Sequence, residues 1–308
     1  MTGARIDGAS VPTYRYSLMG PPRESTPEHW QRFWSDGRPL EDVYSNQERL
    51  LAEALRARDV RGCRALEVGA GTGRDTVALV ERGAVGFVVD YTFAALELAR
   101  EASRRSGVPV HMVCADARAL PFRDGAFGLV FHQGLLEHFR DPALILSENR
   151  RVLESGGVAL IDVPQRYHAW TVLKQILIAL DRWFAGWETQ FSPAELERLV
   201  RRGQLEVSRT YGEWMVPGLP YRAARVLLAK AGVRGLPMYP HGPAWWDRGW
   251  EAWRAWLKER RWALYTCFVI GVVARKPGAG GSDSAAPPGN RGAAAARPGG
   301  APLPGGVA

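Results

Sequence analysis

The chain has 308 residues, 46% of them hydrophobic, and can therefore bury the core of one large domain or of two small ones. Its formal net charge of +8 suits nucleic acid, an anionic membrane surface or an acidic substrate, but no basic run is longer than two residues. The cysteines, Cys63, Cys114 and Cys267, are far apart and odd in number, which argues against a disulfide framework and favours reduced thiols in a cytoplasmic protein.

Residues 1–40 predict an irregular N-terminal arm, because Trp30 and Trp34 stand in a proline-rich setting. The arm lacks the basic start and apolar centre of a secretory signal. We expect it to pack over the catalytic face of a domain that spans 41–276. That domain opens with a helix over 45–57, for which Ser45 is the expected N-cap.

Short apolar runs then alternate with amphipathic stretches, which is typical of strand–helix–strand units around a parallel sheet. Strands are expected at 65–68, 87–89, 110–114, 129–132 and 158–162, and helices at 74–82, 93–106 and 141–154. Gly156 and Gly157 would end the last of these helices. Two later strands, 205–210 and 265–274, complete an α/β fold with a doubly wound, mostly parallel seven-stranded sheet and a helical cap.

The turn after the first strand carries the strongest chemical signal. It reads Gly69-Ala70-Gly71-Thr72-Gly73 and leads directly into a helix, so free backbone amides face any ligand at that helix N-terminus. A dinucleotide fingerprint needs a third glycine where Arg74 stands, which weakens a nicotinamide or flavin interpretation. Asp90 ends the second strand about 20 residues later, where a carboxylate can bind ribose hydroxyls.

Five stretches in this order resemble one known family. They are Leu66 to Gly73, Val89-Asp90, Ala115 to Phe122, Phe127 to His138, which ends in Leu136-Glu137-His138, and Glu148 to Gly157. Together they are similar to the class I S-adenosylmethionine (SAM)-dependent methyltransferases, and within them to the methyltransferase type 11 group. The sequence departs from this pattern at Gly128, where many relatives carry an acidic residue.

The resemblance implies which residues bind SAM. Glu67 and the glycine turn would hold the methionine part, and Asp90 would hold the ribose. Asp116 and the backbone of Ala117 would meet the adenine, Tyr91 would flank one adenine face, and Gln133 would approach the methionine end. The cofactor-binding set is therefore Glu67, Gly69, Ala70, Gly71, Gly73, Asp90, Tyr91, Asp116, Ala117 and Gln133.

Two histidines are candidate general bases, because His132 and His138 lie on or just after the fourth strand, at the carboxyl edge of the sheet. Each has a structural alternative. His132 would then be a polar core residue, and the Glu137-His138 pair would start a helix, since it recurs in relatives with unlike substrates. No metal is expected, because carboxylates and histidines with ligand spacing are not found.

Substrate contacts are expected just after the fifth strand, at Gln165, Tyr167 and His168. Cap insertions follow at 165–202 and 213–262. A helix over 169–187 would turn an apolar face inward, with Lys174, Gln175, Asp181 and Arg182 on its opposite side, and a second helix over 245–261 repeats tryptophans at helical spacing. Residues 277–308 predict a disordered tail rich in Gly, Ala, Pro and Ser.

The tryptophans leave two interpretations open. They either form a lid buried over the substrate pocket, or lie in a membrane interface with arginines near anionic lipid, which would imply a lipid-like acceptor. Nucleic acid is disfavoured, because the basic residues mingle with tryptophans. The predicted function is SAM-dependent methylation of a small-molecule or lipid-like acceptor at oxygen, with carbon and nitrogen left open as the methylated atom. The alternatives are a non-catalytic SAM-binding partner or sensor and a nucleotide-dependent oxidoreductase. The oligomeric state is not predicted.

Overall fold

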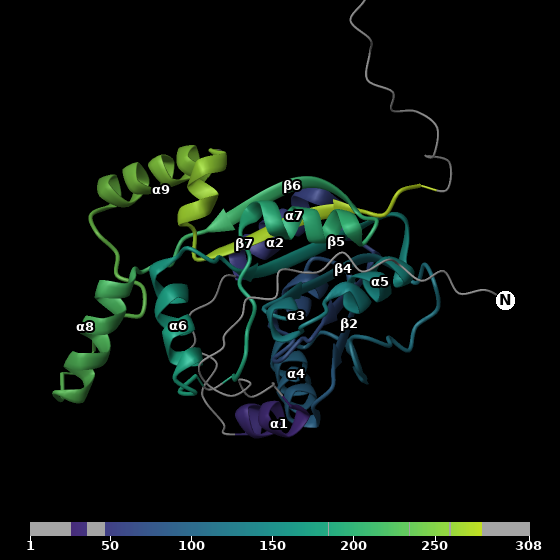
Figure 1. Cartoon of the computed structure of the whole chain (residues 1–308), viewed down its shortest axis with the longest axis horizontal. Coiled ribbons are helices and arrows are strands. Elements are labelled where there is room, and N and C mark those ends of the chain that lie inside the picture. Colours follow the sequence, from purple (N-terminus) through teal and green to yellow (C-terminus); the bar gives the residue numbers. More distant parts are fainter. Residues whose placement is uncertain (1–25, 36–46, 184, 234, 259, 279–308) are drawn as a thin grey trace, which may run out of the picture. The chain divides into compact units, whose positions relative to one another are not determined.

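A seven-stranded sheet with the order β3-β2-β1-β4-β5-β7-β6 lies at the centre of the computed structural model (Figure 1). All neighbours pair in parallel except β7, which is antiparallel to both β5 and β6. The structure describes residues 26–35, 47–183, 185–233, 235–258 and 260–278. The strands are β1 (Arg64–Val68), β2 (Val85–Asp90), β3 (Val110–Cys114), β4 (Phe127–Gln133), β5 (Leu153–Pro164), β6 (Glu206–Glu213) and β7 (Val269–Arg275).

The predicted fold class is confirmed, with two changes at element boundaries. The strand β5 begins at Leu153, which pairs with Phe127, so the predicted helix over 141–154 ends early and Gly156 and Gly157 lie inside the strand. The last strand begins only at Val269, because the preceding residues form a 3₁₀ helix, η3 (Arg261–Thr266). Pairing across the sheet therefore decided both boundaries.

Helices cover both faces of the sheet. The helices α2 (Gln47–Ala57), α3 (Arg74–Val80) and α4 (Phe93–Ser106) contact one another and pack with β1 and β2 on one face. The helices α5 (Ala143–Val152) and α7 (Pro193–Arg202) pack on the other face. Alternate residues of β1 serve the two layers: Leu66 packs with α5 and α7, and Ala65 packs with α2 and α3.

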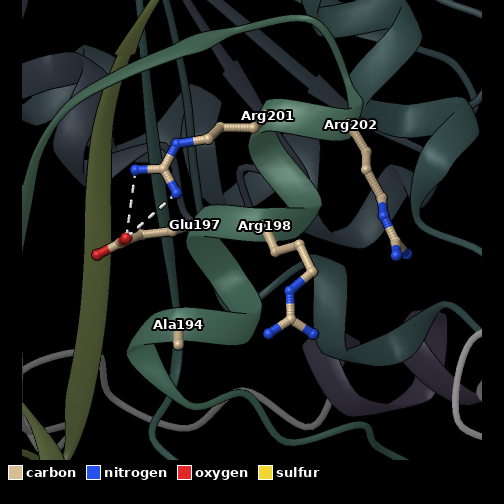
Figure 2. A pocket seen from close by; sticks show the side chains of 5 residues that line it. All are labelled: Ala194, Glu197, Arg198, Arg201 and Arg202. Atoms are coloured by element: carbon tan, nitrogen blue, oxygen red, sulfur yellow. Dashed lines mark hydrogen bonds and ion pairs between the residues drawn. The ribbon is translucent and has the colours of Figure 1, made fainter.

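The helix α7 falls in the range predicted as a cap but belongs to the layers that flank the sheet. A capping box formed by Ser192 and Glu195 starts it, and its Leu196 and Val200 are fully buried. Its charged residues line a hollow on its outer side, where Arg198, Arg201 and Arg202 project and Arg201 bonds to Glu197 (Figure 2). This hollow is lined by one helix alone and contains no residue from the carboxyl ends of the strands.

The additions to this fold are the short helices α1 (Pro27–Ser35), α6 (Ala169–Ala179), α8 (Leu219–Lys230) and α9 (Ala244–Lys258). Within the described ranges, no helix is long and apolar enough to cross a membrane. The expected N-cap Ser45 and residues 279–308 of the predicted tail lie outside the described residues.

Candidate functional site

A pocket of about 660 Å³ opens at the carboxyl ends of β1, β2, β3 and β4, and its size is typical of a small-molecule site. It brings together residues from distant parts of the chain. Its walls come from the arm, from the glycine turn and from the segments after β2, β3 and β4. The lining residues include Trp30, Phe33, Trp34, Glu67, Gly69, Ala70, Gly71, Asp75, Asp90, Tyr91, Asp116, Ala117, Gln133, Leu135, His138, Phe139, Arg140, Leu144 and Trp187.

The glycine turn has a backbone conformation that side chains resist. Gly69, Gly71 and Gly73 have φ values of +65°, +52° and +64°, in the left-handed region that favours glycine. A Cβ atom added to Gly71 would lie 2.8 Å from the indole of Trp34, and one added to Gly69 would lie 2.7 Å from Leu135. The turn therefore forms a cradle that a single methyl group would fill.

Asp90 ties this cradle to the end of β2. Its Oδ2 accepts a hydrogen bond from the Gly71 amide at 3.0 Å, and its Oδ1 accepts bonds from the Thr92 amide and hydroxyl at 2.9 and 2.8 Å. Burial raises the pKa of this carboxyl. Oδ1 thus accepts two bonds and Oδ2 one, which leaves a lone pair on Oδ2 that suits a ribose hydroxyl.

Two buried carboxyls make the floor of the pocket acidic. Glu67 accepts bonds from the Thr76 amide at 3.0 Å and the Thr76 hydroxyl at 2.5 Å, and burial together with Asp75 raises its pKa to about 8. Burial also raises the pKa of Asp75, whose Oδ1 has no hydrogen-bond partner among the described residues. A cation would relieve this desolvation, and SAM carries both an ammonium and a sulfonium. The cradle and these two carboxyls, which a bound cation would help to ionise, fit SAM.

The residues predicted to meet adenine lie at the opposite wall. Asp116 accepts hydrogen bonds from the amide and the guanidinium of Arg118, and these bonds lower the pKa of its carboxyl. Ala117 and Tyr91 line the same wall, and Tyr91 is 38% exposed, so its ring is accessible from the pocket. These positions are compatible with the predicted adenine contacts.

The described part of the N-terminal arm, α1, covers the mouth of the pocket. It contacts α4, and the Gln31 side chain accepts a bond from the Ala94 amide at 3.2 Å. The Trp30 and Trp34 rings stack with their centroids 6.4 Å apart, and Trp34 lies over Gly71. The arm thus places aromatic side chains against the glycine turn, in the same pocket as the carboxyls of Glu67 and Asp75.

His138 also lines the pocket. It ends a short 3₁₀ helix, η2 (Leu136–His138), and its ring meets Trp30 edge to face, with centroids 4.9 Å apart. Burial lowers its pKa to about 4, although Glu188 favours the protonated form. The imidazole is therefore neutral at physiological pH, as a general base must be. Gln133 lines the same pocket, with its Nε2 3.4 Å from Asp162 Oδ2.

The structure does not bring His132 to the pocket. Its side chain is fully buried and does not line the cavity, and burial lowers its pKa to about 3. Side chains alternate along a strand, so Gln133 and His132 on β4 point to opposite faces of the sheet. His132 is therefore a core residue, which was the structural alternative for this position.

The three predicted substrate residues have structural tasks and lie outside the pocket lining. Gln165 is fully buried; its Oε1 accepts bonds from the Tyr167 and His168 amides, and its Nε2 donates to the Tyr265 carbonyl. His168 caps α6 by accepting a bond from the Trp170 amide at 3.2 Å. Tyr167 stacks on Tyr265. In this structure the hydrogen-bonding groups of Gln165 and His168 are therefore used by the chain itself.

The helix α6 reverses the predicted orientation. The helix ends at Ala179, and Lys174, expected on the outer side, is buried in an ion pair with Glu188, which also accepts a bond from the Trp183 indole at 2.6 Å. The predicted inward face is instead exposed at Leu173 and Leu180. A buried lysine needs a carboxylate partner. Because Glu188 follows the end of α6 in the chain, the spacing of residues within the helix could not predict that Lys174 is buried.

The buried carboxyl of Glu137 makes stability depend on pH. Burial and Glu188 raise its pKa from 4.5 to about 8, so the folded state holds this proton more tightly and loses stability as the pH rises through that value. We expect Glu137→Gln to reduce the fall in unfolding free energy between about pH 5 and about pH 8.5 by on the order of 1–3 kcal/mol in urea titrations.

The exposed Glu81 supplies the matched control for this measurement. Glu81→Gln makes the same chemical change without burial and should leave the pH dependence as it is in the wild type. An unchanged pH dependence in Glu137→Gln as well would contradict a protonated, buried Glu137.

Comparisons with known proteins agree with this geometry. Residues 66–161 match the family model described as "Methyltransferase domain". The chain is 30% identical over 191 residues to the ubiquinone biosynthesis O-methyltransferase of Thiobacillus denitrificans, covering 59% of this chain and 81% of that protein. It is 30% identical over 224 residues to the 2-methyl-6-phytyl-1,4-hydroquinone methyltransferase 2 of Oryza sativa, covering 71% of this chain and 51% of that protein.

A solved structure has the same fold. It is the 1,6-didemethyltoxoflavin-N1-methyltransferase of Burkholderia thailandensis with bound S-adenosylhomocysteine, which is 17% identical with a TM-score of 0.51 and covers 82% of this chain and 87% of that one. The sequence relatives, the family model and the sheet order identify the donor as SAM. The chain belongs to the class I SAM-dependent methyltransferases.

Proposed function

We propose that this methyltransferase transfers the methyl group of SAM to a hydroxyl oxygen of a lipid-like aromatic acceptor, such as a phenol or hydroquinone with an isoprenoid tail. The observation that carries the proposal is a neutral histidine, His138, in a pocket lined by aromatic and aliphatic side chains. The names of two curated relatives, which refer to ubiquinone biosynthesis and to a phytyl-hydroquinone, support an acceptor of this kind.

SAM would be held by the turn from Gly69 to Gly73, by Asp90 and by the wall around Asp116. When bound, it supplies a methyl group already activated on a sulfonium, so transfer is an in-line displacement governed by positioning. Glu67 and Asp75 favour its positive charges, and the small residues of the turn let it approach the backbone. Trp34 would close over the cradle and exclude water.

His138 would accept the proton of the acceptor. As the acceptor oxygen forms its bond to the methyl carbon, the carbon–sulfur bond breaks with its electron pair left on sulfur, and the hydroxyl proton moves to the imidazole. The ring nitrogen that carries no proton in the neutral imidazole would be the accepting atom. The nearby carboxylate of Glu188 stabilises the resulting imidazolium.

Other residues of the pocket suit an aromatic acceptor with an apolar substituent. Leu135, Phe139, Leu144 and Trp187 line the same pocket as His138, and Arg140 lies 4.8 Å from the centre of the Trp187 ring. An acceptor with an isoprenoid tail resides in a bilayer, so we propose peripheral association with a membrane during turnover.

An acceptor panel tests the proposal. Purified protein and SAM are incubated with hydroquinones that differ only in tail length, and S-adenosylhomocysteine and methylated product are measured by mass spectrometry. We expect a hydroxyl-dependent product and a KM that falls as the tail lengthens. The matched acceptor with its hydroxyls already methylated should give none. S-adenosylhomocysteine that binds without any turnover on the panel would favour a non-catalytic SAM-binding protein instead.

A further inference from the structure

A surface of exposed tryptophans covers α9 and the start of η3. Its members are Trp245, Trp246, Trp250, Trp253, Trp256 and Trp262, half of the tryptophans in the chain, with exposed fractions from 46% to 67%. We propose that this tryptophan surface binds an anionic lipid bilayer at the level of the headgroups. The proposal deepens the proposed function, and rests on it only for the source of the acceptor.

The tryptophans of α9 lie on one side of the helix. With 100° per residue, the five on α9 fall within an arc of about 140°, and the charged residues Asp247, Arg248 and Glu251 lie outside it. Trp250 and Trp253 contact each other, with ring centroids 4.8 Å apart. None of these rings lines the cofactor pocket and all are exposed, so the α9 tryptophans do not form a lid buried over it.

The C-terminal end of α9 attaches the helix to the body. Leu257 is buried, and the Arg254 guanidinium forms an ion pair with Glu213 at the end of β6 and lies 6.0 Å from the centre of the Trp214 ring. These contacts hold the helix with its tryptophans outward. Indole prefers the boundary between headgroups and acyl chains, because its ring is apolar and its N–H can stay hydrated.

Two neighbouring helices extend the apolar area. The helix α8 buries none of its residues and exposes Val226, Leu227 and Leu228. The helix α6 exposes Val172, Leu173, Ile176 and Leu180. The helix α6 follows the end of β5 and α8 follows the end of β6, which is the edge of the sheet that holds the pocket (Figure 1). A bilayer bound there would therefore lie at the same edge of the sheet as the pocket.

The positive charge around the tryptophan surface favours an anionic bilayer over a second copy of the chain as its binding partner. Residues 216–262 carry nine lysines and arginines against three acidic residues, and the net charge of the entire chain is +8. Two copies meeting through this surface would bring the same excess of positive charge face to face. Anionic headgroups complement it, and each basic residue near the membrane contributes to binding.

Vesicle flotation tests the surface. The full chain is mixed with vesicles of phosphatidylcholine alone or with roughly one third phosphatidylglycerol, and we expect it to float with the anionic vesicles. Trp246→Ser/Trp250→Ser/Trp253→Ser should weaken partitioning by at least about tenfold. Exchanging Arg248 for glutamine should weaken it less, and added salt should weaken the wild type, since the electrostatic part is screened.

Matched controls separate membrane binding from folding and catalysis. Leu55→Ser removes an exposed apolar side chain on α2, outside this surface, and should float like the wild type. The triple variant should keep its affinity for S-adenosylhomocysteine and its turnover of a short-tailed acceptor, while losing activity only on acceptor held in vesicles. Flotation is read without turnover, so it can succeed even if the proposed reaction fails.

Three outcomes would overturn the proposal. The wild type would not float with anionic vesicles at low salt, or the triple variant would float as well as the wild type. Alternatively, the wild type would be a dimer that the triple variant converts to a monomer without any vesicle binding, which would assign the surface to a second copy.

Discussion

Replacing His138 by glutamine is expected to lower kcat for a hydroxyl acceptor by about 10²–10⁴-fold, the usual contribution of a general base. The affinity for S-adenosylhomocysteine should change by less than about threefold, because the residue is proposed to contact the acceptor rather than the cofactor. Steady-state kinetics and isothermal titration give the two values. A loss of affinity equal to the loss of kcat would instead indicate a structural role in shaping the pocket.

The pH profile distinguishes a base from a packing residue. Burial lowers the pKa of His138 to about 4, so its imidazole is already neutral at the pH where an ordinary histidine still titrates. The wild-type kcat/KM should therefore stay level near neutrality and fall only as the pH drops toward about 4. The glutamine variant should lose this acidic limb, and its rate should rise with pH as the acceptor ionises by itself.

His132→Gln is the matched control for this experiment. It removes the other candidate base, which is fully buried and outside the pocket lining, and should leave the pH profile unchanged even if it lowers the melting temperature. If His132→Gln rather than His138→Gln removed the acidic limb, the assignment of the base would be reversed.

Replacing Asp90 by alanine is expected to weaken SAM binding by about 10–100-fold, because it removes a charge-assisted hydrogen bond to a ribose hydroxyl. The same change removes an acceptor from the Gly71 amide, which holds the cradle in place. Isothermal titration with S-adenosylhomocysteine measures the affinity, and circular dichroism shows whether the variant is folded.

Thr92→Val tests whether a change in SAM affinity comes from the Asp90 carboxylate itself or from the hydrogen bonds that hold the carboxylate in place. It removes the hydroxyl that donates to Asp90 Oδ1 at 2.8 Å but keeps the carboxylate and the bond from Gly71. We expect a loss of stability of about 1–2 kcal/mol with SAM affinity within a few-fold of the wild type. If Asp90→Ala bound S-adenosylhomocysteine as tightly as the wild type, Asp90 would not be a cofactor-binding residue.

The amino-acid sequence by itself determined the sheet, the cradle and the donor. Apolar runs at strand spacing set the order of strands and helices, and the glycine turn and Asp90 each follow a strand directly. In a parallel sheet, residues at the carboxyl ends of strands meet at one edge, so short local patterns were enough to assemble this part of the site. The structure places Glu67, Asp116 and Gln133 in the same pocket.

Only the tertiary structure decided which histidine reaches the pocket and which faces of the added helices are buried. In the sequence, His132 and His138 are both near the end of the fourth strand. In the structure, His132 lies on β4 and is buried in the core, whereas His138 ends η2 and lines the pocket. The orientation of α6 depends on Glu188, and the exposure of the α9 tryptophans depends on Leu257 and Arg254. Helical periodicity shows that a helix has an apolar side, but only its packing partners determine whether that side meets protein or solvent.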